Sequence, residues 1–421
     1  MYQLTRLDNG LRIATAAMPH MASVSLGFWV GVGGRFESAD LSGASHFIEH
    51  LLFKGTRKRS ARQISQDVEG LGGYLNAFTS EENTCFFAKA GHDRLPDLLD
   101  VLFDMFLHSR FDPAEIRKER EVIKEEVAMY RDQPQHYVHE LLNAAQWPDQ
   151  PLGRSITGTI KNLDQLNRSA LLNHQRSHYG AANTFVVAAG RVSHPRLVAE
   201  VARLTRAFPP GSRHPFAPAF NPAQQPVLTL DSREIEQTQL ALGIRTCSRH
   251  DPRRYALRLL NTILGENMSS RLFQILREDT GLTYSISSSL SFFEDVGDLV
   301  ISAGLDTGNV PKALTLLAKE LSRLRDKPPG KAELARARDY VIGQSNLSLE
   351  GTEHHMMWLG EQLLGYGKIT RPAILKRALR QVTPAQIQSA ARDFFHPGLL
   401  TLALVSPLKS AGHLQRYLRQ L

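Results

Sequence analysis

The sequence predicts an α+β fold of two structurally similar α/β domains, each a mostly antiparallel or mixed β-sheet flanked by helices. The length of 421 residues exceeds what one hydrophobic core usually supports. Residues 207–226 hold six of the 21 prolines and almost no hydrophobic periodicity, which indicates a linker at the midpoint. Both halves follow the order strand, loop, helix, strand, which suggests a duplicated unit. We therefore expect an N-terminal domain over residues 1–212 and a C-terminal domain over residues 213–421.

The first half begins with a hairpin signal. Residues 2–7 and 11–16 are apolar runs on either side of Asp8-Asn9-Gly10, a turn sequence that favours tight hairpins. We expect a buried strand at residues 23–32, a helix at 62–71 and a strand or hairpin at 74–88. Two further helices should follow, one at 95–109 and one that opens at Pro113 and ends before Pro134.

Residues 42–56 read SGASHFIEHLLFKGT, which predicts a helix that Ser42 caps and that ends by Gly55. His46 and His50 are four residues apart, so on a helix they project from one face and can hold one metal ion together. Glu49 lies beside them, where a carboxylate can act on water at the metal. The order His-x-x-Glu-His is the inverzincin pattern, and a catalytic zinc site usually has a third protein ligand.

The alternative to a metal site is an amphipathic helix whose histidines are surface residues or satisfied core residues. Apolar residues surround the motif, among them Phe47, Ile48 and Leu51, and they argue for burial. Two imidazoles and a carboxylate buried together are costly unless they pair or bind a metal. The sequence therefore favours zinc.

The helix that opens at Pro113 carries the candidates for the third ligand. Glu119 and Glu126 are seven residues apart and share a face, whereas Glu125 lies about a hundred degrees off that face. Acidic residues among lysines and arginines also suit a solvated helix face with i,i+4 pairs. Periodicity alone therefore leaves the third ligand open.

The second half repeats the order of elements without the histidine motif. Strands are expected at residues 227–230 and 237–244, and a helix at about residues 252–264. That helix contains ALRLLNTILG and no His-x-x-Glu-His. We therefore expect a metal in the first domain only.

The composition excludes several classes of protein. No apolar run is long enough to span a bilayer and the N-terminus lacks a signal-peptide pattern, so a cytoplasmic protein is expected. Cys85 and Cys247 are the only cysteines, which excludes a disulfide framework or a cysteine zinc site. The net charge of +8 could suggest nucleic acid, but the densest basic run, residues 54–62, is interpreted as a solvated loop. We expect neither nucleic acid nor a membrane as a partner.

Five separated motifs resemble the pitrilysin-type metallopeptidases, specifically the half-length members that include the mitochondrial processing peptidase subunits. They are HFIEH with LLFKGT, YLNAFTSEENT, EREVIKEEVAMYRDQP, PLGRSITGT and LREDTGLTYSI. The resemblance covers essentially the whole chain. It implies one Zn2+ per chain held by His46, His50 and Glu126. It also implies that Glu49 is the general base and that Glu119 is an outer-shell group that orients a histidine or its helix.

The resemblance also implies substrate contacts. Family members with active C-terminal halves use an arginine and a tyrosine seven residues apart to hold the substrate backbone, and Arg277 and Tyr284 have this spacing. Without the resemblance, these two residues suggest a charged helix end and a strand aromatic. Asn76 and Ala77 match the edge strand that pairs with an extended substrate by β-strand addition.

Two segments depart from the family pattern. Residues 352–357 read TEHHMM, where relatives tend to carry an arginine close to the methionine. We interpret His354 and His355 as helix-surface or interface residues and not as a second metal site. Cys85-Phe86-Phe87 stands where tyrosines are common. Neither change touches the zinc set, so we expect any effect to concern the side chains accepted beside the scissile bond.

Together, these implications describe a zinc endopeptidase for extended peptides or unfolded segments. The zinc set and the Arg277/Tyr284 pair occur in one chain, so a homodimer is expected, with each chain forming half of a clamshell. The competing class is a non-catalytic core or scaffold subunit of a larger assembly, although such subunits usually lose metal ligands. The natural substrate does not follow from the sequence.

Overall fold

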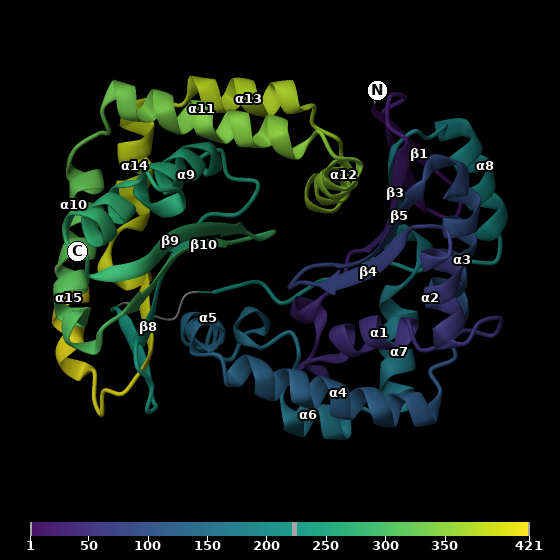
Figure 1. The fold of residues 1–421 in the computed structure, drawn as a ribbon, viewed down its shortest axis with the longest axis horizontal. Coiled ribbons are helices and arrows are strands. Elements are labelled where there is room, and N and C mark those ends of the chain that lie inside the picture. The colour runs from purple at the N-terminus through teal and green to yellow at the C-terminus, as the bar shows by residue number, and fades with distance from the viewer. Residues whose placement is uncertain (1, 221–224, 420–421) are drawn as a thin grey trace. The chain divides into compact units, whose positions relative to one another are not determined.

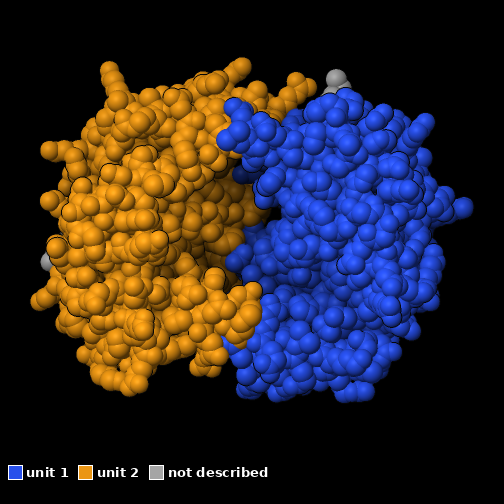
Figure 2. Space-filling view, in the orientation of Figure 1, with its two compact units in different colours: residues 1–128, 154–217, 346–369 blue, residues 129–153, 218–345, 370–421 orange. Residues whose placement is uncertain are grey.

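The computed structural model describes residues 2–220 and 225–419, so residues 221–224 of the expected linker lie outside the described residues. The chain forms two compact units, shown in blue and orange in Figure 2. The first unit comprises residues 1–128, 154–217 and 346–369, and the second comprises residues 129–153, 218–345 and 370–421. Each half of the chain thus gives one segment to the other unit. The division into domains at residue 212 stays a prediction, from which the compact units differ by these two segments and by residues 213–217, which belong to the first unit.

The first unit is built on a six-stranded mixed sheet in the order β1-β2-β6-β3-β5-β4. Four of its strands, β1, β3, β5 and β4, are labelled in Figure 1. The predicted hairpin is confirmed as β1 (Tyr2–Arg6) and β2 (Arg12–Ala17). Strand β2 pairs in parallel with β6, and the other neighbours are antiparallel. The remaining strands are β3 (Ser23–Val30), β4 (Tyr74–Thr79), β5 (Thr84–Gly91) and β6 (Thr184–Gly190).

Helices cover both faces of this sheet, because alternate strand residues are apolar on each side. On β3, Phe28 joins a core with the helices of one face, while Trp29 packs on the other face against helix α12 (Thr352–Tyr366). The other helices of this unit are α1 (Ala44–Leu52), α2 (Ala61–Glu69), α3 (Leu95–His108), α4 (Pro113–Arg131), α6 (Ile160–Gln165), α7 (Arg168–His178) and α8 (His194–Leu204). The last residues of α4, from Met129, belong to the second unit.

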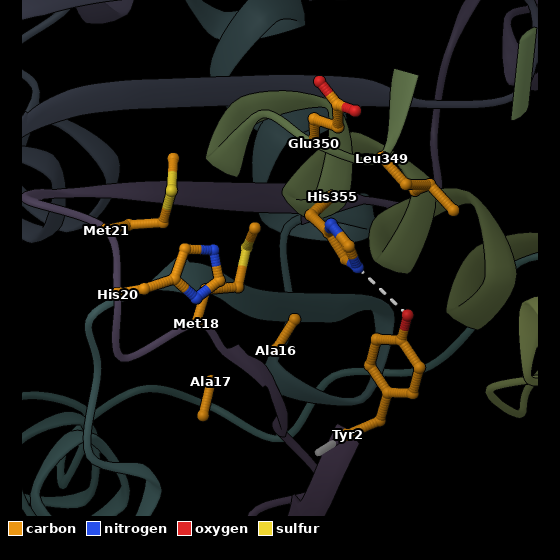
Figure 3. Close-up of a pocket in the computed structure, with 9 residues that line it drawn as sticks. All are labelled: Tyr2, Ala16, Ala17, Met18, His20, Met21, Leu349, Glu350 and His355. Atoms are coloured by element: carbon orange, nitrogen blue, oxygen red, sulfur yellow. Dashed lines mark hydrogen bonds between the residues drawn. The ribbon is translucent and has the colours of Figure 1, made fainter. Parts of the chain in front are cut away.

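Helix α12 packs closely against the sheet at Gly360, which has no side chain. A Cβ on Gly360 would lie 2.1 Å from Cε2 of Trp29, whose indole is 1% exposed. On the same helix His354 is exposed, whereas Nε2 of His355 lies 3.0 Å from the Tyr2 hydroxyl at the edge of a pocket (Figure 3). His355 therefore attaches α12 to β1. Among the described residues, neither histidine belongs to a group that could hold a metal.

The second unit repeats the pattern with a five-stranded sheet in the order β7-β11-β8-β10-β9. Strands β7 and β11 are parallel and the other neighbours are antiparallel, so the order matches that of the first sheet without β1. The prediction of two similar α/β domains in an α+β fold is confirmed. The strands are β7 (Val227–Ser232), β8 (Thr238–Thr246), β9 (Thr283–Phe292), β10 (Gly297–Leu305) and β11 (Leu400–Ser406).

Helix α5 (Pro134–Gln146), from the first half of the chain, packs through Val138 and Leu142 on one face of the second sheet. The expected helix near residues 252–264 is α9 (Arg254–Asn261), continued by a π-helical turn over Thr262–Glu266. The other helices are α10 (Val310–Asp326), α11 (Lys331–Ser348), α13 (Pro372–Gln381), α14 (Pro384–Phe394) and α15 (Gln415–Leu418). None of the helices in the described residues has both the length and the apolar character needed to cross a membrane.

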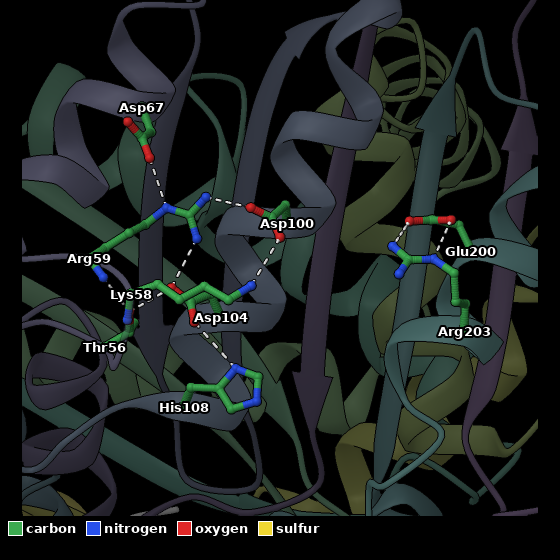
Figure 4. A network of polar contacts seen from close by, with 9 residues as sticks. All are labelled: Thr56, Lys58, Arg59, Asp67, Asp100, Asp104, His108, Glu200 and Arg203. Atoms are coloured by element: carbon green, nitrogen blue, oxygen red, sulfur yellow. Dashed lines mark hydrogen bonds and ion pairs between the residues drawn. The ribbon is translucent and has the colours of Figure 1, made fainter.

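The expectation of a solvated basic loop at residues 54–62 is wrong for Arg59. Its guanidinium lies 2.8 Å from Asp67, 2.5 Å from Asp100 and 2.9 Å from Asp104, and its side chain is 14% exposed (Figure 4). Asp104 is itself buried, so the ion pairs compensate a carboxylate that has lost most of its water. The three aspartates lie 8 to 45 residues beyond Arg59, on α2 and α3, and the local sequence gives no sign of them.

Replacing Gly360 by alanine should destabilise the protein, because the added Cβ overlaps the buried indole of Trp29. We expect urea unfolding to report a loss of about 1–3 kcal/mol in the free energy of unfolding. Gly343 in α11 is a matched control, since no atom lies within 4 Å of a Cβ built there. Gly343→Ala should stabilise the protein by about 0.5–1 kcal/mol through helix propensity. Equal effects of the two substitutions would contradict the close contact of α12 with the sheet.

Candidate metal centre

Helix α1 starts from a turn that a buried carboxylate holds. The expectation that Ser42 caps this helix is wrong. The N-cap residue is Gly43, with φ +93°, and as a glycine it provides no side-chain cap. The Glu37 carboxylate instead accepts hydrogen bonds from the N–H groups of Gly43 at 2.8 Å and Ser45 at 2.6 Å. A carboxylate at this position also complements the helix dipole. Burial raises the pKa of Glu37 to about 7 despite these hydrogen bonds.

The motif PLGRSITGT at residues 151–159 contacts the same turn. A Cβ on Gly43 would lie 2.7 Å from the carbonyl oxygen of Thr157 and 3.1 Å from Cα of Gly158. Gly158 also has a positive φ of +75°. The two segments can approach this closely because both residues are glycines. The motif therefore helps to fix the start of the helix that carries the histidines.

Helices α1 and α4 bring three candidate ligands together. His46 Nε2 and His50 Nε2 each lie 3.7 Å from Glu126 Oε2, and one ligand atom from each residue lies within 4.8 Å of the other two. Tetrahedral zinc with bonds of about 2.0–2.1 Å separates its ligand atoms by about 3.3 Å. The three side chains therefore fit a zinc ion with little movement. No other group of three or more His, Cys, Asp or Glu side chains within the described residues meets the same limit.

The protonation of His46 suits a metal ligand. Its residue is 9% exposed, and burial, together with the neighbouring His50, lowers the pKa of His46 to about 3. The imidazole is therefore neutral near pH 7 and has a lone pair to donate. Its Nε2 is the nitrogen that faces Glu126, and the 3.7 Å to Oε2 of that residue is too long for a hydrogen bond. The three candidate ligands do not satisfy one another, whereas a cation between them would.

Glu119 fixes the second histidine from behind. Its Oε2 lies 3.1 Å from His50 Nδ1 and its Oε1 lies 2.9 Å from Lys54 Nζ. Burial opposes ionisation of Glu119, but hydrogen bonds from His50 and Lys54 outweigh it and lower the pKa of this carboxyl. An ionised carboxylate only accepts, so Nδ1 of His50 donates to Glu119, and this contact turns Nε2 toward Glu126. This contact agrees with the orienting role expected for Glu119.

Glu49 lies on the same helix, outside the group of three candidate ligands. Thr79, the last residue of β4, donates a hydrogen bond from its hydroxyl to Glu49 Oε2 at 2.6 Å. Burial raises the pKa of Glu49, although the bond from Thr79 and the nearby His50 act in the opposite direction. The structure thus holds one carboxylate oxygen in place and leaves Oε1 for chemistry.

Three polar residues of this site were not singled out from the sequence. Lys54 lies four residues after His50, so helical spacing could have placed it near the histidine. Thr79 lies within the motif YLNAFTSEENT, whose pattern does not distinguish this threonine from its neighbours. Glu37 gave no signal, because it is seven residues before Ala44 in a loop of irregular structure.

Asn76 and Ala77 lie where the resemblance placed them, on an edge strand. Strand β4 ends the six-stranded sheet, and Asn76 is exposed on it. The N–H of Ala77 donates to Oδ1 of Asn76 at 2.8 Å. The side chain of Asn76 therefore occupies one main-chain donor of this edge strand.

Arg277 and Tyr284 meet in the second unit. Arg277 Cζ lies 4.9 Å from the centre of the Tyr284 ring, and the tyrosine is 80% exposed. The pairing of β9 with β10 explains the exposure, because Thr283 pairs with Leu305 and Ser285 with Gly304, which leaves Tyr284 as the extra residue of a β-bulge. Bulges redirect side chains in this way near functional sites.

Two family descriptions match successive parts of the chain. Residues 12–160 match the family described as Insulinase (Peptidase family M16), and residues 165–341 match the one described as Peptidase M16 inactive domain. An uncharacterized zinc protease of Mycobacterium bovis is 38% identical over 396 residues, which cover 92% of this chain and 89% of that protein. The chain belongs to peptidase family M16. An uncharacterized zinc protease of Bacillus subtilis, YmxG, is 35% identical to this M16 chain, with 95% and 97% of the two chains covered.

Solved structures agree on the fold of this M16 chain. A protease from Helicobacter pylori superposes with a TM-score of 0.90 at 18% identity, covering 97% of this chain and 99% of that one. A peptidase M16 inactive domain from Pseudomonas fluorescens gives a TM-score of 0.89 at 17% identity, with the same coverage. The resemblance to half-length members of the family, inferred from the motifs, is confirmed.

Replacing Glu119 by glutamine should weaken metal binding without removing a candidate ligand. The amide loses the charge that stabilises the Nδ1 proton of His50, and such outer-shell changes cost about 10–100-fold in metal affinity. Competition between the protein and a zinc chelator measures the change. Glu125→Gln is the matched control, because Glu125 is an exposed glutamate on the same helix. Equal zinc affinities for the two variants would argue against the orienting role of Glu119.

Proposed function

We propose that this M16 chain is a zinc-dependent endopeptidase that cleaves peptides or unfolded polypeptide segments. The observation that carries the proposal is the approach of one ligand atom from each of His46, His50 and Glu126 to within 4.8 Å of one another. The names of the relatives, which include several zinc proteases, support the same activity.

His46, His50 and Glu126 would hold one zinc ion per chain. When bound, zinc supplies a Lewis acid that polarises a peptide carbonyl and makes water a nucleophile near neutral pH. The neutral His46 already has the lone pair that a ligand requires, and Glu119 already fixes the orientation of the His50 ring. Little reorganisation of the site is then needed when the metal binds.

Glu49 moves the proton in the proposed reaction. Thr79 holds Oε2 of this carboxylate at 2.6 Å, so Oε1 takes the proton from the attacking water. Glu49 then returns this proton to the nitrogen of the departing amine, which completes the hydrolysis of the peptide bond. The direction of the Glu49 side chain is therefore set by a residue at the end of an edge strand.

Contacts with the substrate backbone are proposed for four further residues. Asn76 and Ala77 lie on the edge strand β4, where an extended peptide can add as a further strand once the Asn76 side chain releases the Ala77 N–H. Arg277 and Tyr284 supply a guanidinium and a phenol that can donate to carbonyl oxygens, including the one that becomes negative during the reaction. Main-chain recognition of this kind favours extended peptides with little dependence on their side chains.

We further propose that two chains form a homodimer that closes like a clamshell around the substrate. The N-terminal half of one chain would face the C-terminal half of the other. A closed chamber excludes large folded proteins, so the size and flexibility of the substrate would determine selectivity more than its sequence.

Metal analysis and a single substitution test the catalytic proposal. Purified protein should contain one zinc per chain, and a chelator should abolish peptide cleavage. Glu49→Gln should retain zinc and lose about 10²–10⁴-fold in kcat, because it removes the proton acceptor and no ligand. Glu125→Gln should remain active. A non-catalytic scaffold subunit would instead bind no zinc and cleave no peptide.

Mixing two inactive variants tests the homodimer. If Glu49 of one chain works with Tyr284 of the partner, Glu49→Gln and Tyr284→Phe should each be inactive alone and regain partial activity after subunit exchange. The mixed dimer then contains one site with both native residues. Peptide cleavage measured before and after exchange gives the result, and mixtures that stay inactive would indicate that each site is built within one chain.

A further inference from the structure

A cavity of about 300 Å³ opens beside Arg277 and Tyr284 in the second unit. Helix α5 forms one side of it, and strands β8, β9 and β10 form the other. Its volume lies at the lower end of the range for small-molecule sites and suits one amino-acid side chain. The polar residues that the inference uses are Gln135, His139, Gln239, Arg277, Tyr284 and Ser302.

Arg277 is the only lining residue with a permanent charge among the described residues, and no aspartate or glutamate lines the cavity. The guanidinium carbon lies 4.8 Å from the centre of the Phe273 ring and 4.9 Å from that of Tyr284, and these rings hold it in place. The nearest carboxylate is that of Glu278, a half-exposed residue whose Oε1 lies 3.7 Å from Arg277 Nε. That separation is an ion pair at an exposed glutamate but is too long for a hydrogen bond, so Glu278 does not occupy the N–H donor of Arg277 Nε.

The other polar groups of the cavity are neutral hydrogen-bonding groups. Burial, and then the neighbouring His136, lowers the pKa of His139, so this imidazole is uncharged near pH 7. Its Nε2 lies 3.4 Å from the hydroxyl of Ser302. The amide of Gln239 covers the backbone of Gly304, opposite the bulge that exposes Tyr284. The cavity thus offers a guanidinium and neutral hydrogen-bonding groups, with no aspartate or glutamate in its own lining.

We propose that this cavity is a subsite for a peptide residue that carries a carboxylate, and that it discriminates against lysine and arginine. The inference rests on the proposed function, because Arg277 and Tyr284 are where substrate would contact this unit. Gln135, His139 and Gln239 act as specificity-determining residues. The carboxylate can come from an aspartate or glutamate side chain or from the C-terminus of a peptide.

Binding and cleavage of a matched peptide set test the subsite. The peptides carry a fluorophore and differ only by Glu, Gln or Lys at one position, scanned along the sequence, each with a free or an amidated C-terminus. Fluorescence anisotropy with the zinc-loaded Glu49→Gln variant measures binding without cleavage. At one position, Glu should bind about fivefold more tightly than Lys, the factor expected for a partly exposed ion pair.

A charge placed in the cavity should reverse this preference. Gln239→Glu keeps the side-chain shape and should favour Lys over Glu, whereas Ser289→Glu is the matched control on the exposed part of β9 outside the cavity. Gln135→Glu, at an exposed position on α5, gives the same test if Gln239→Glu fails to fold, as judged by circular dichroism.

The outcomes separate the subsite from the proposed function. A preference for Glu side chains identifies a side-chain carboxylate as the ligand, and a preference for the free C-terminus alone identifies the terminal carboxylate. Equal binding of Glu, Gln and Lys peptides, free and amidated, would overturn the subsite even if the native protein cleaves them. If the native protein shows no chelator-sensitive cleavage, the peptidase proposal is overturned instead. Binding to the Glu49→Gln variant is measured independently of cleavage.

Discussion

The Glu119 carboxylate joins helices α1 and α4 at the point where the candidate zinc ligands meet. It accepts from His50 on one oxygen and from Lys54 on the other, so the last turn of α1 and the residue just beyond its C-cap are tied to one residue of α4. Glu126 lies two turns further along α4 and reaches both histidines from there. The separation of the three ligand atoms therefore depends on a contact in which none of the ligating atoms takes part. At the other end of α1, the Glu37 carboxylate fixes the turn from which the helix starts.

The two units share one sheet topology and carry different polar residues on it. Each sheet has one parallel pair of strands and, at the opposite edge, an antiparallel edge strand. One face of each sheet is covered by a helix from the other half of the chain. In the first unit, the helix after the buried strand carries two histidines and a glutamate. In the second unit, the corresponding helix α9 has no histidine or carboxylate, and Tyr284 at the bulge of the edge strand β9 lies beside Arg277 from the preceding π-helix. The two units thus share a scaffold and differ in the polar residues placed on it.

Much of this arrangement follows from short-range patterns. The Asn9-Gly10 hairpin, the histidine helix and the helix from Pro113 all have local signals, and each forms close to its expected bounds. The choice of Glu126 over Glu125 came from the family resemblance, because periodicity alone left it open. The sequence could not reveal features that depend on distant partners. Ser42 is the residue type expected at a cap, but the Glu37 carboxylate holds that turn. The aspartates around Arg59 come from two later helices.

The contact between α12 and the first sheet restricts how this protein can be divided. Trp29, Phe87, Phe185 and Val187 are buried on one face of that sheet by a helix encoded more than 150 residues after the last strand of the sheet. A fragment that stops near the proline-rich midpoint would contain all three candidate zinc ligands and still expose this aromatic face to water. Such a fragment would tend to aggregate, and reconstituting the metal-binding half in isolation would require residues 346–369 to be supplied as a separate peptide or joined by circular permutation.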